Sequence, residues 1–178
     1  MKRFLAISGS LRRVSTNTAL IQAMAGSVAE DVTVEIYRGM GELPIFNPDR
    51  EGELTPSPVL DLAAKIRSAD GLIIACPEYA HGIPGGLKNL LDWQVSRDEI
   101  PHKPVMLMRA SSRSDISHAA LEEVLRTMSV RLMPEPGIAI HLLGKKPDEV
   151  ERILSEPAMR SNLSTALRTF AEWIDRLS

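Results

Sequence analysis

The sequence predicts an α/β fold in which a parallel sheet is covered by helices on both faces. Short apolar runs alternate along the chain with segments whose apolar residues recur at helical spacing, a pattern typical of strands joined by crossover helices. Three of the runs, Phe4 to Ile7, Leu72 to Ala75 and Val105 to Met108, are continuously apolar. Because strands buried on both faces have this composition, we expect these three at the centre of the sheet.

The second predicted strand is expected near an edge of the sheet. Between Val32 and Tyr37, apolar residues alternate with Thr33 and Glu35, which indicates that one face of this strand meets solvent or a thin cover. The five predicted strands are Arg3 to Ile7, Val32 to Tyr37, Gly71 to Ala75, Pro104 to Arg109 and Gly137 to His141.

Amphipathic stripes with helical spacing lie between the strands. A long helix carrying Leu163 to Leu177 is expected to close the sheet, and Pro157 separates it from a shorter helix around Val150 to Leu154. Five strands with right-handed crossovers fit the flavodoxin-like order 2-1-3-4-5, a three-layer sandwich with helices on both faces. Residues 1–178 show no internal repeat or linker and are expected to form one domain, in which 39–58 is a long loop. The shorter stripes are Leu20, Ile21, Met24 and Val28; Val59, Leu62, Ala63 and Ile66; Leu87, Leu90 and Leu91; and Leu121, Val124, Leu125 and Met128.

The composition argues against several classes of protein. Twenty-one basic and 23 acidic side chains give a formal charge of −2, without the cationic excess that nucleic-acid binding requires. The apolar run at Phe4 is too short for a signal-peptide core or a membrane span, so we expect a cytoplasmic protein without a membrane partner. Cys76 is the only cysteine, which excludes an intrachain disulfide, a multi-cysteine metal site and an iron–sulfur cluster. The four histidines show no i, i+4 pairing, so no metal site is expected.

The loop after the first strand has the donors that a phosphate monoester needs. In the order 2-1-3-4-5, ligands bind outside the carboxyl ends of the first and third strands, where the winding reverses. The G-x-G-x-x-G and Walker signatures are absent, so neither a dinucleotide half nor a phosphoryl-transfer loop is indicated. Alternatively, Ser15 or Asn17 only caps the following helix and Arg12 is a solvated charge. The donors next to the free N–H groups of the helix start are Ser10, Arg12, Ser15, Thr16, Asn17 and Thr18.

The loop after the third strand suits a flat ring. Pro77 and Pro84 stiffen it, while Gly82, Gly85 and Gly86 allow the backbone to approach a planar ligand without a Cβ in the way. Backbone N–H groups of this loop could bond the N1/O2 edge and N5 of an isoalloxazine ring and so stabilise negative charge on its reduced form.

Several short motifs are spread over these loops and the helix that follows the second of them. They are Gly9-Ser10-Leu11-Arg12 with Ser15 and Asn17, Pro77-Glu78-Tyr79, Ile83-Pro84-Gly85, and Leu87-Lys88-Asn89 with Asp92-Trp93. Over Lys2 to about Met133, the chain resembles the NAD(P)H-dependent FMN reductase family. The resemblance implies FMN as cofactor, NADPH or NADH as reductant, and a homodimer or homotetramer with sites near the interface. The implied cofactor-binding residues are Ser10, Arg12, Ser15, Thr16, Asn17, Pro77, Glu78, Tyr79, Ala80, His81, Gly82 and Ser111.

The chain departs from the pattern of that family at three places. Ala80 stands where Asn is common and Gly82 where Ser is common, so side-chain contacts at the ring edge are expected to be missing. After the fourth strand, Arg109 to Ser114 replace a small, Gly-rich loop. Arg109 and Arg113 in this loop either hold the 2′-phosphate of NADPH or are solvated charges.

Four side chains near these loops have both a chemical and a structural interpretation. His81 is a possible catalytic proton donor, but hydride transfer often needs no protein acid, so a wall-forming role is favoured. Glu78 is interpreted as a positioning residue rather than a general base. Cys76 is interpreted as a small, half-buried residue rather than a nucleophile. Trp93 is interpreted as a packing or interface residue rather than one that stacks on the flavin.

The sequence therefore predicts an oxidoreductase with a ping-pong mechanism. NAD(P)H gives hydride to FMN and leaves, and a quinone, free flavin, azo compound or metal oxyanion then takes two electrons in the same open site. One rival is an FMN-binding electron carrier or regulatory flavoprotein, against which the weak net charge speaks. A second rival is a flavin-free enzyme that uses the same loop to bind a nucleotide or sugar phosphate.

Overall fold

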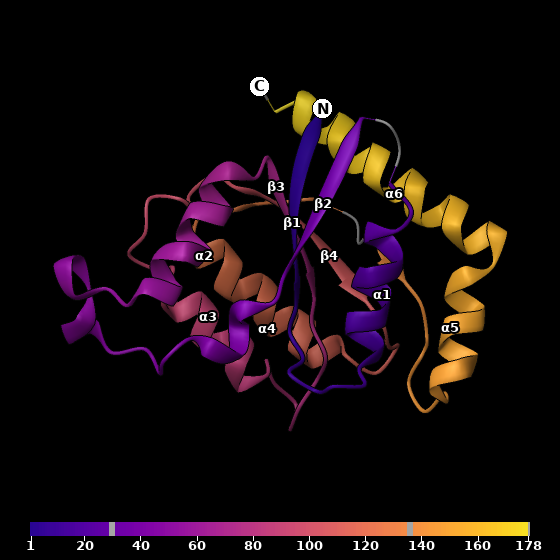
Figure 1. The fold of residues 1–178 in the computed structure, drawn as a ribbon, viewed down its shortest axis with the longest axis horizontal. Coiled ribbons are helices and arrows are strands. Elements are labelled where there is room, and N and C mark those ends of the chain that lie inside the picture. The colour runs from indigo at the N-terminus through magenta and orange to yellow at the C-terminus, as the bar shows by residue number, and fades with distance from the viewer. Residues whose placement is uncertain (29–30, 135–136, 178) are drawn as a thin grey trace.

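The computed structural model describes residues 1–28, 31–134 and 137–177. Its sheet has the order β2-β1-β3-β4-β5, and all the paired strands run parallel (Figure 1). The predicted order is therefore confirmed, with the alternating strand β2 at one edge and the continuously apolar strands β1, β3 and β4 inside. The strands are β1 Lys2–Ser8, β2 Val32–Tyr37, β3 Gly71–Ala75, β4 Pro104–Arg109, β5 Arg131–Leu132 and β6 Ile138–Ala139.

The strand predicted over Gly137 to His141 is wrong in extent. Only β6 forms there, and the additional short strand β5 precedes it. Strand β5 pairs with Pro104 and Val105 at the start of β4, whereas β6 pairs with Met108 and Arg109 at its end. The far edge of the sheet is thus made of two segments of two residues each. Segments this short carry no detectable alternation in the sequence.

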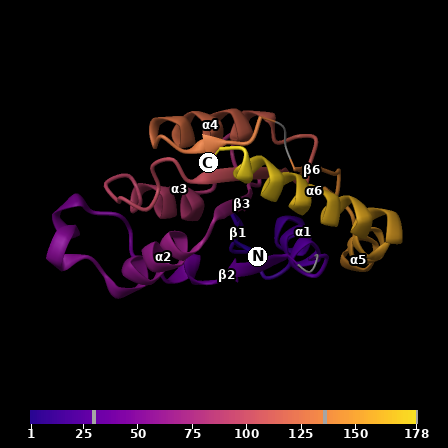
Figure 2. The ribbon, with the colours of Figure 1, turned by 90° about the horizontal axis from the view of Figure 1, so that it is seen from above.

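Two layers of helices cover the sheet (Figure 2). One layer holds α2, α3 and α4, and the other holds α1, α5 and α6. The predicted stripes lie on helices except at three ends: α1 stops before Val28, where Gly26 caps it, α4 ends at Thr127 with Met128 as its C-cap residue, and α6 stops before Leu177. Pro157 begins α6, as a residue without a backbone N–H can. The helices are α1 Thr16–Ala25, α2 Ser57–Ser68, α3 Gly85–Asp92, α4 Asp115–Thr127, α5 Pro147–Ser155 and α6 Pro157–Asp175.

Each face of the sheet has its own apolar core. Leu5 and Ile7 of β1 pack in the cluster that includes α2, α3 and α4, whereas Phe4 and Ala6 pack in the cluster with α1, α5 and α6. Successive side chains of a strand point to opposite faces, so a strand covered on both sides needs apolar residues at every position. This explains the continuously apolar runs of the central strands.

Asn89 of helix α3 and Trp93, the C-cap residue of this helix, anchor the long loop before α2. Asn89 accepts a hydrogen bond from Phe46 N at 2.8 Å and donates from Nδ2 to Pro44 O at 3.0 Å. Trp93, only 1 % exposed, donates from Nε1 to Pro44 O at 2.8 Å. The structural interpretation of Trp93 as a packing residue is therefore correct. The loop contains three short 3-10 turns, Gly39–Glu42, Pro48–Arg50 and Gly52–Leu54, and extends sideways from the helices (Figure 1).

Candidate functional site

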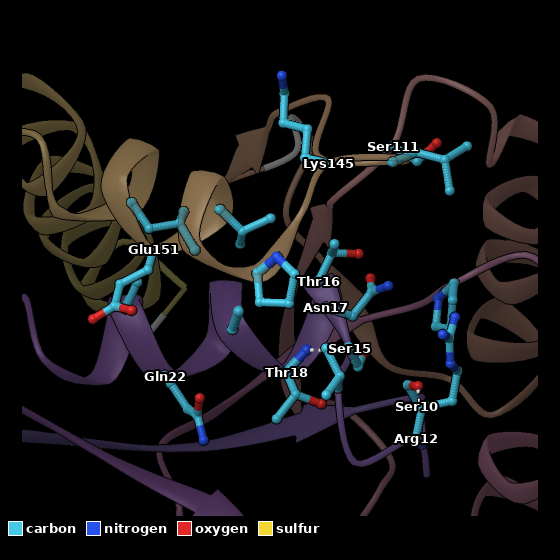
Figure 3. Close-up of a pocket in the computed structure, with 18 of the residues that line it drawn as sticks. Ser10, Arg12, Ser15, Thr16, Asn17, Thr18, Gln22, Ser111, Lys145 and Glu151 are labelled. Atoms are coloured by element: carbon cyan, nitrogen blue, oxygen red, sulfur yellow. Dashed lines mark hydrogen bonds between the residues drawn. The ribbon is translucent and has the colours of Figure 1, made fainter.

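A cavity of about 860 Å³ opens at the carboxyl edge of the sheet. Its walls come from the loop between β1 and α1, from the loops after β3 and β4, and from the chain that leads into α5 and α6. Figure 3 shows Ser10 and Arg12 at one end of it and Gln22 and Glu151 at the other. Nine predicted cofactor-binding residues line the cavity: Ser10, Arg12, Ser15, Thr16, Asn17, Pro77, Glu78, Tyr79 and Ser111. Ala80, His81 and Gly82 do not line it.

Helix α1 begins at the cavity wall, where its first turn offers hydrogen-bond donors to a ligand. Ser15 is its N-cap residue, and Ser15 Oγ accepts a hydrogen bond from Thr18 N at 3.4 Å. The capping interpretation of Ser15 is thus correct, but its hydroxyl proton is still free to donate to a ligand. The N–H groups of Thr16 and Asn17 have no preceding helical turn to bond. Because the first turn holds no acidic side chain, the positive end of the helix dipole favours an anion there.

Asn17 is the most informative side chain of the cavity. It is only 6 % exposed, and its Oδ1 atom has no hydrogen-bond partner among the described residues. A buried, unpaired polar atom costs about 1–3 kcal/mol, so a site that keeps one usually gains a partner from a ligand. Phosphate oxygens would accept from the amide NH₂ group, and ribityl hydroxyls would donate to the amide oxygen.

Ser10 connects the two predicted loops. Ser10 is 8 % exposed, and its Oγ accepts a hydrogen bond from Arg12 N at 3.3 Å and lies 3.2 Å from Tyr79 Oη. The preceding Gly9 permits this approach, because a Cβ there would come within 2.9 Å of a methyl group of Leu87. The loops after β1 and β3 are therefore packed directly against each other.

The residues that follow Tyr79 form a tight turn beside the cavity. Tyr79 and Gly82 exchange two backbone hydrogen bonds of 3.2 and 3.0 Å, and Ala80 and His81 have φ values of 50° and 56°. Positive φ at both central positions is the mark of a type I′ turn, in which Asn and Gly are the favoured residues. Ala80 and His81 adopt it at a cost, since the left-handed region is disfavoured for side chains with a Cβ.

Glu78 contacts the start of helix α4. Its side chain is 14 % exposed; Oε2 accepts a hydrogen bond from Ser117 N at 3.0 Å, and Oε1 lies 3.2 Å from His81 Nδ1. The carboxylate therefore supports the first turn of α4 and the tight turn at once. This geometry supports the interpretation of Glu78 as a positioning residue, because both of its oxygens are already engaged.

The loop after β4 closes the cavity on the side opposite the α1 loop. Ser111 lines the cavity, and its Oγ accepts a hydrogen bond from Arg113 N at 3.0 Å. Arg113 also lines the cavity. Arg109 does not, and its Nη1 lies 2.7 Å from Asp115 Oδ1.

Two buried groups near the cavity are chemically quiet. Burial raises the pKa of Cys76 to about 12, so its thiol stays protonated and is a poor nucleophile, as the sequence interpretation favoured. Burial, with the nearby Arg109 charge, lowers the pKa of His118 to about 4, so this imidazole is neutral at physiological pH.

The cavity can hold a phosphorylated, partly apolar ligand. Its basic residues Arg12, Arg13, Arg113, Lys145 and Arg160 outnumber the acidic residues Glu78 and Glu151, although the chain as a whole is acidic. The phosphate, hydroxyl chain and flat ring of FMN match the donors at α1, the unpaired Oδ1 atom of Asn17 and the stiff loop after β3. Within residues 1–28, 31–134 and 137–177 there is no cluster of three or more His, Cys, Asp or Glu side chains placed to bind a metal ion.

Comparisons with known proteins agree with this ligand. The sequence profile of the family described as NADPH-dependent FMN reductase matches residues 2–142. An NAD(P)H-dependent FMN reductase of Pseudomonas aeruginosa is 32 % identical over 180 residues, which cover 98 % of this chain and 96 % of that protein. A quinone reductase of Escherichia coli is 28 % identical over 97 % of this chain and 95 % of its own. A subunit of NADH:(hydroxy)cinnamate reductase from Vibrio ruber is 37 % identical over 80 % of this chain and 71 % of its own.

The solved structures show the same fold. A flavoenzyme NAD(P)H:(acceptor) oxidoreductase of Paracoccus denitrificans superposes with a TM-score of 0.78 at 23 % identity, over 99 % of this chain and 98 % of that one. The fold and the cavity thus define a flavodoxin-like flavoprotein. The chain belongs to the NADPH-dependent FMN reductase family and is an FMN-dependent NAD(P)H oxidoreductase.

One wall of the cavity is made of residues that were not predicted from the sequence. The unpredicted lining residues include Arg13, Gln22, Leu143, Gly144, Lys145, Pro147, Val150, Glu151, Leu154, Ser155 and Arg160. Arg13 follows Arg12 directly and could have been found by including the whole loop. No signal in the sequence marks the C-terminal wall, because α5 reaches the cavity only by packing beside α1.

Proposed function

We propose that residues 1–178 act as one FMN-binding domain whose phosphate site is the start of helix α1. The buried Asn17 side chain carries this proposal: its Oδ1 has no partner among the described residues and can accept from a ribityl hydroxyl, while its amide NH₂ group can donate to the phosphate. Ser10, Arg12, Ser15 and Thr16 surround it and complete a set of donors that a phosphate dianion requires. Pro77, Glu78, Tyr79 and Ser111 then lie along the ribityl chain and ring.

The turn at Ala80 to Gly82 is assigned to the mouth of the site. A Cβ at Gly82 would meet only Tyr79 O, at 3.8 Å, and one at Gly85 would meet no atom within 4 Å, so this side is open to a flat ligand. His81 projects from the turn as an exposed side chain and has no role in proton transfer in this proposal.

Bound FMN supplies the ability to accept hydride and to pass on two electrons. The residues of the chain orient the reactants and leave one face of the site open. Reduced nicotinamide and the acceptor use that opening in turn, which gives ping-pong kinetics. Glu78 keeps the loop after β3 fixed against α4 throughout, and no acid from the chain is needed.

We propose a quinone or a free flavin as the acceptor. Relatives named quinone reductase and FMN reductase, aligned over nearly the whole chain, support this class. An azo compound or a metal oxyanion is a less supported acceptor. The family membership disfavours an electron carrier without NAD(P)H oxidase activity.

We further propose a cytoplasmic homodimer or homotetramer in which the carboxyl edge of the sheet faces a partner. Large apolar side chains stand exposed on the loops around the cavity and at the start of α4: Leu11, Val14, Tyr79, Ile116 and Leu143. Patches of this kind on a polar surface are typical of interfaces. Among the described residues, no helix is both long and apolar enough to cross a membrane.

The proposal predicts a yellow protein whose flavin absorbance is bleached by NADPH or NADH. Steady-state consumption of NAD(P)H with 1,4-benzoquinone would support the oxidoreductase, whereas a flavin reduced only by another protein would support a carrier. A colourless protein that fails to take up added FMN would refute the cofactor site, and mass spectrometry of bound ligands would then identify the true occupant.

A further inference from the structure

The two arginines of the loop after β4 have different surroundings. Arg109 is neutralised by Asp115, with 2.7 Å between Nη1 and Oδ1, and it does not line the cavity. Arg113 lines the cavity and forms no ion pair with any acidic side chain of the described residues. Of these two arginines, Arg113 is therefore the one available to an anion that enters the site.

The backbone that carries Arg113 is held in place by its neighbours. Arg113 N donates to Ser111 Oγ at 3.0 Å, and Ser114 Oγ donates to Ser111 O at 2.9 Å. Ser112 N donates to His141 Nδ1 at 3.2 Å, which ties the loop to the chain after β6. Such a fixed loop presents its arginine at lower entropic cost than a mobile one would.

The FMN phosphate does not need Arg113. It has nearer donors in Arg12, Ser15, Thr16 and Asn17 at the β1 side of the cavity. Strand β3 separates β1 from β4 in the sheet, so the loops that follow β1 and β4 start roughly 10 Å apart, two strand spacings of about 4.8 Å. A second anionic group on the β4 side would therefore find Arg113 unoccupied.

We infer that Arg113 selects reactants that carry an anionic group, either the 2′-phosphate of NADPH or an acidic group of the electron acceptor. The inference rests on the proposed FMN site, because it assumes that the phosphate of FMN is bound at α1. The guanidinium forms two parallel hydrogen bonds to a phosphate, carboxylate or sulfonate, a geometry that a neutral reactant cannot reproduce.

The variant Arg113→Gln tests the inference, with Arg109→Gln and Arg126→Gln as controls. Arg126 lies on α4, pairs with Glu122 and is remote from the cavity lining, so its loss changes the net charge equally. Isothermal titration of the FMN-loaded proteins with 2′,5′-ADP and with 5′-AMP measures the contribution of the 2′-phosphate without turnover. Reoxidation of the reduced proteins by 1,4-naphthoquinone and by its 2-sulfonate measures the contribution of an acidic acceptor.

Arg113→Gln is expected to have one of two effects, each of about tenfold. Either the binding of 2′,5′-ADP weakens relative to that of 5′-AMP, or reoxidation by the naphthoquinone sulfonate slows relative to reoxidation by 1,4-naphthoquinone. The controls are expected to change neither ratio by more than about twofold. Loss with 2′,5′-ADP assigns Arg113 to NADPH, and loss with the sulfonate assigns it to the acceptor. Unchanged ratios in Arg113→Gln, or an equal loss in Arg109→Gln, would overturn the inference. An FMN titration of the same proteins separates this result from a failure of the cofactor site itself.

Discussion

Replacing Asn17 by leucine should stabilise the protein without FMN and at the same time weaken FMN binding. Asn17 is buried at the start of α1 with an amide oxygen that has no partner among the described residues. Leucine has a similar shape and leaves no polar atom unpaired. The substitution therefore removes the energetic cost of the unpaired Asn17 oxygen in the protein without FMN. It also removes the amide NH₂ group that donates to FMN when the cofactor is bound.

The magnitudes follow from the structure. An unpaired buried polar atom costs about 1–3 kcal/mol, so we expect the apoprotein to gain about 1 kcal/mol after some loss in packing. For a chain of this size that gain raises the melting temperature by about 2–4 °C. Loss of a hydrogen bond to a charged phosphate costs about 1.5–3 kcal/mol, which weakens FMN binding by about ten- to hundredfold.

Asn89→Leu is the matched control, because both ends of the Asn89 amide are hydrogen-bonded, to Phe46 N and Pro44 O. This variant should lose about 2 kcal/mol of stability and bind FMN as tightly as the parent. Thermal unfolding of the apoproteins and quenching of flavin fluorescence on titration measure the two effects. An Asn17→Leu apoprotein that melts lower than the parent and binds FMN equally well would refute the reasoning.

Three other predictions concern groups around the site. Cys76 should react with iodoacetamide at about pH 8 only after unfolding, because burial raises its pKa to about 12; labelling of the folded protein at the rate of a free thiol would contradict this. The pKa of His118 is about 4 in the folded chain against an ordinary 6.5, so only the unfolded chain takes up the proton between these values. Stability is then full above about pH 6.5 and falls by up to about 3 kcal/mol toward pH 4. In urea unfolding His118→Leu should flatten that slope, and an unchanged slope would rule His118 out as its source. Gly9→Ala should lower the free energy of unfolding by about 1–3 kcal/mol, because the added Cβ would lie 2.9 Å from a Leu87 methyl group. The control Gly85→Ala should leave it unchanged, since a Cβ there would meet no atom within 4 Å. Equal melting temperatures of the two variants would show that the loop at Gly9 shifts to accommodate the Cβ without cost.

The local sequence pattern was sufficient to predict the three central strands of the sheet. Strands β1, β3 and β4 are buried on both faces, and this forces apolar residues at every position of Phe4 to Ile7 and its counterparts. The two-residue strands β5 and β6 have no such requirement, since each pairs with only one end of β4. Their edge position leaves the composition free, and the predicted fifth strand was wrong in extent for that reason.

The candidate site also has a part that could be predicted from the sequence and a part that could not. Donors such as Ser10, Arg12 and Asn17 all lie in or just after the one loop that joins β1 to α1, so they could be predicted from that short stretch of sequence. The type I′ turn at Ala80 and His81 could not, because neither residue is a usual one for positive φ.

By itself, the sequence determined the order of the strands, the edge at which ligands bind and the donors at the start of α1. These are local properties, fixed by the period of apolar residues and by the composition of single loops. Only the tertiary structure decided that the chain from Leu143 to Arg160 contributes a wall of the cavity, that Asn17 Oδ1 has no partner among the described residues, and that Asp115 neutralises Arg109 but not Arg113. Those facts depend on which segments, distant in the sequence, pack beside one another, and no local pattern encodes such contacts.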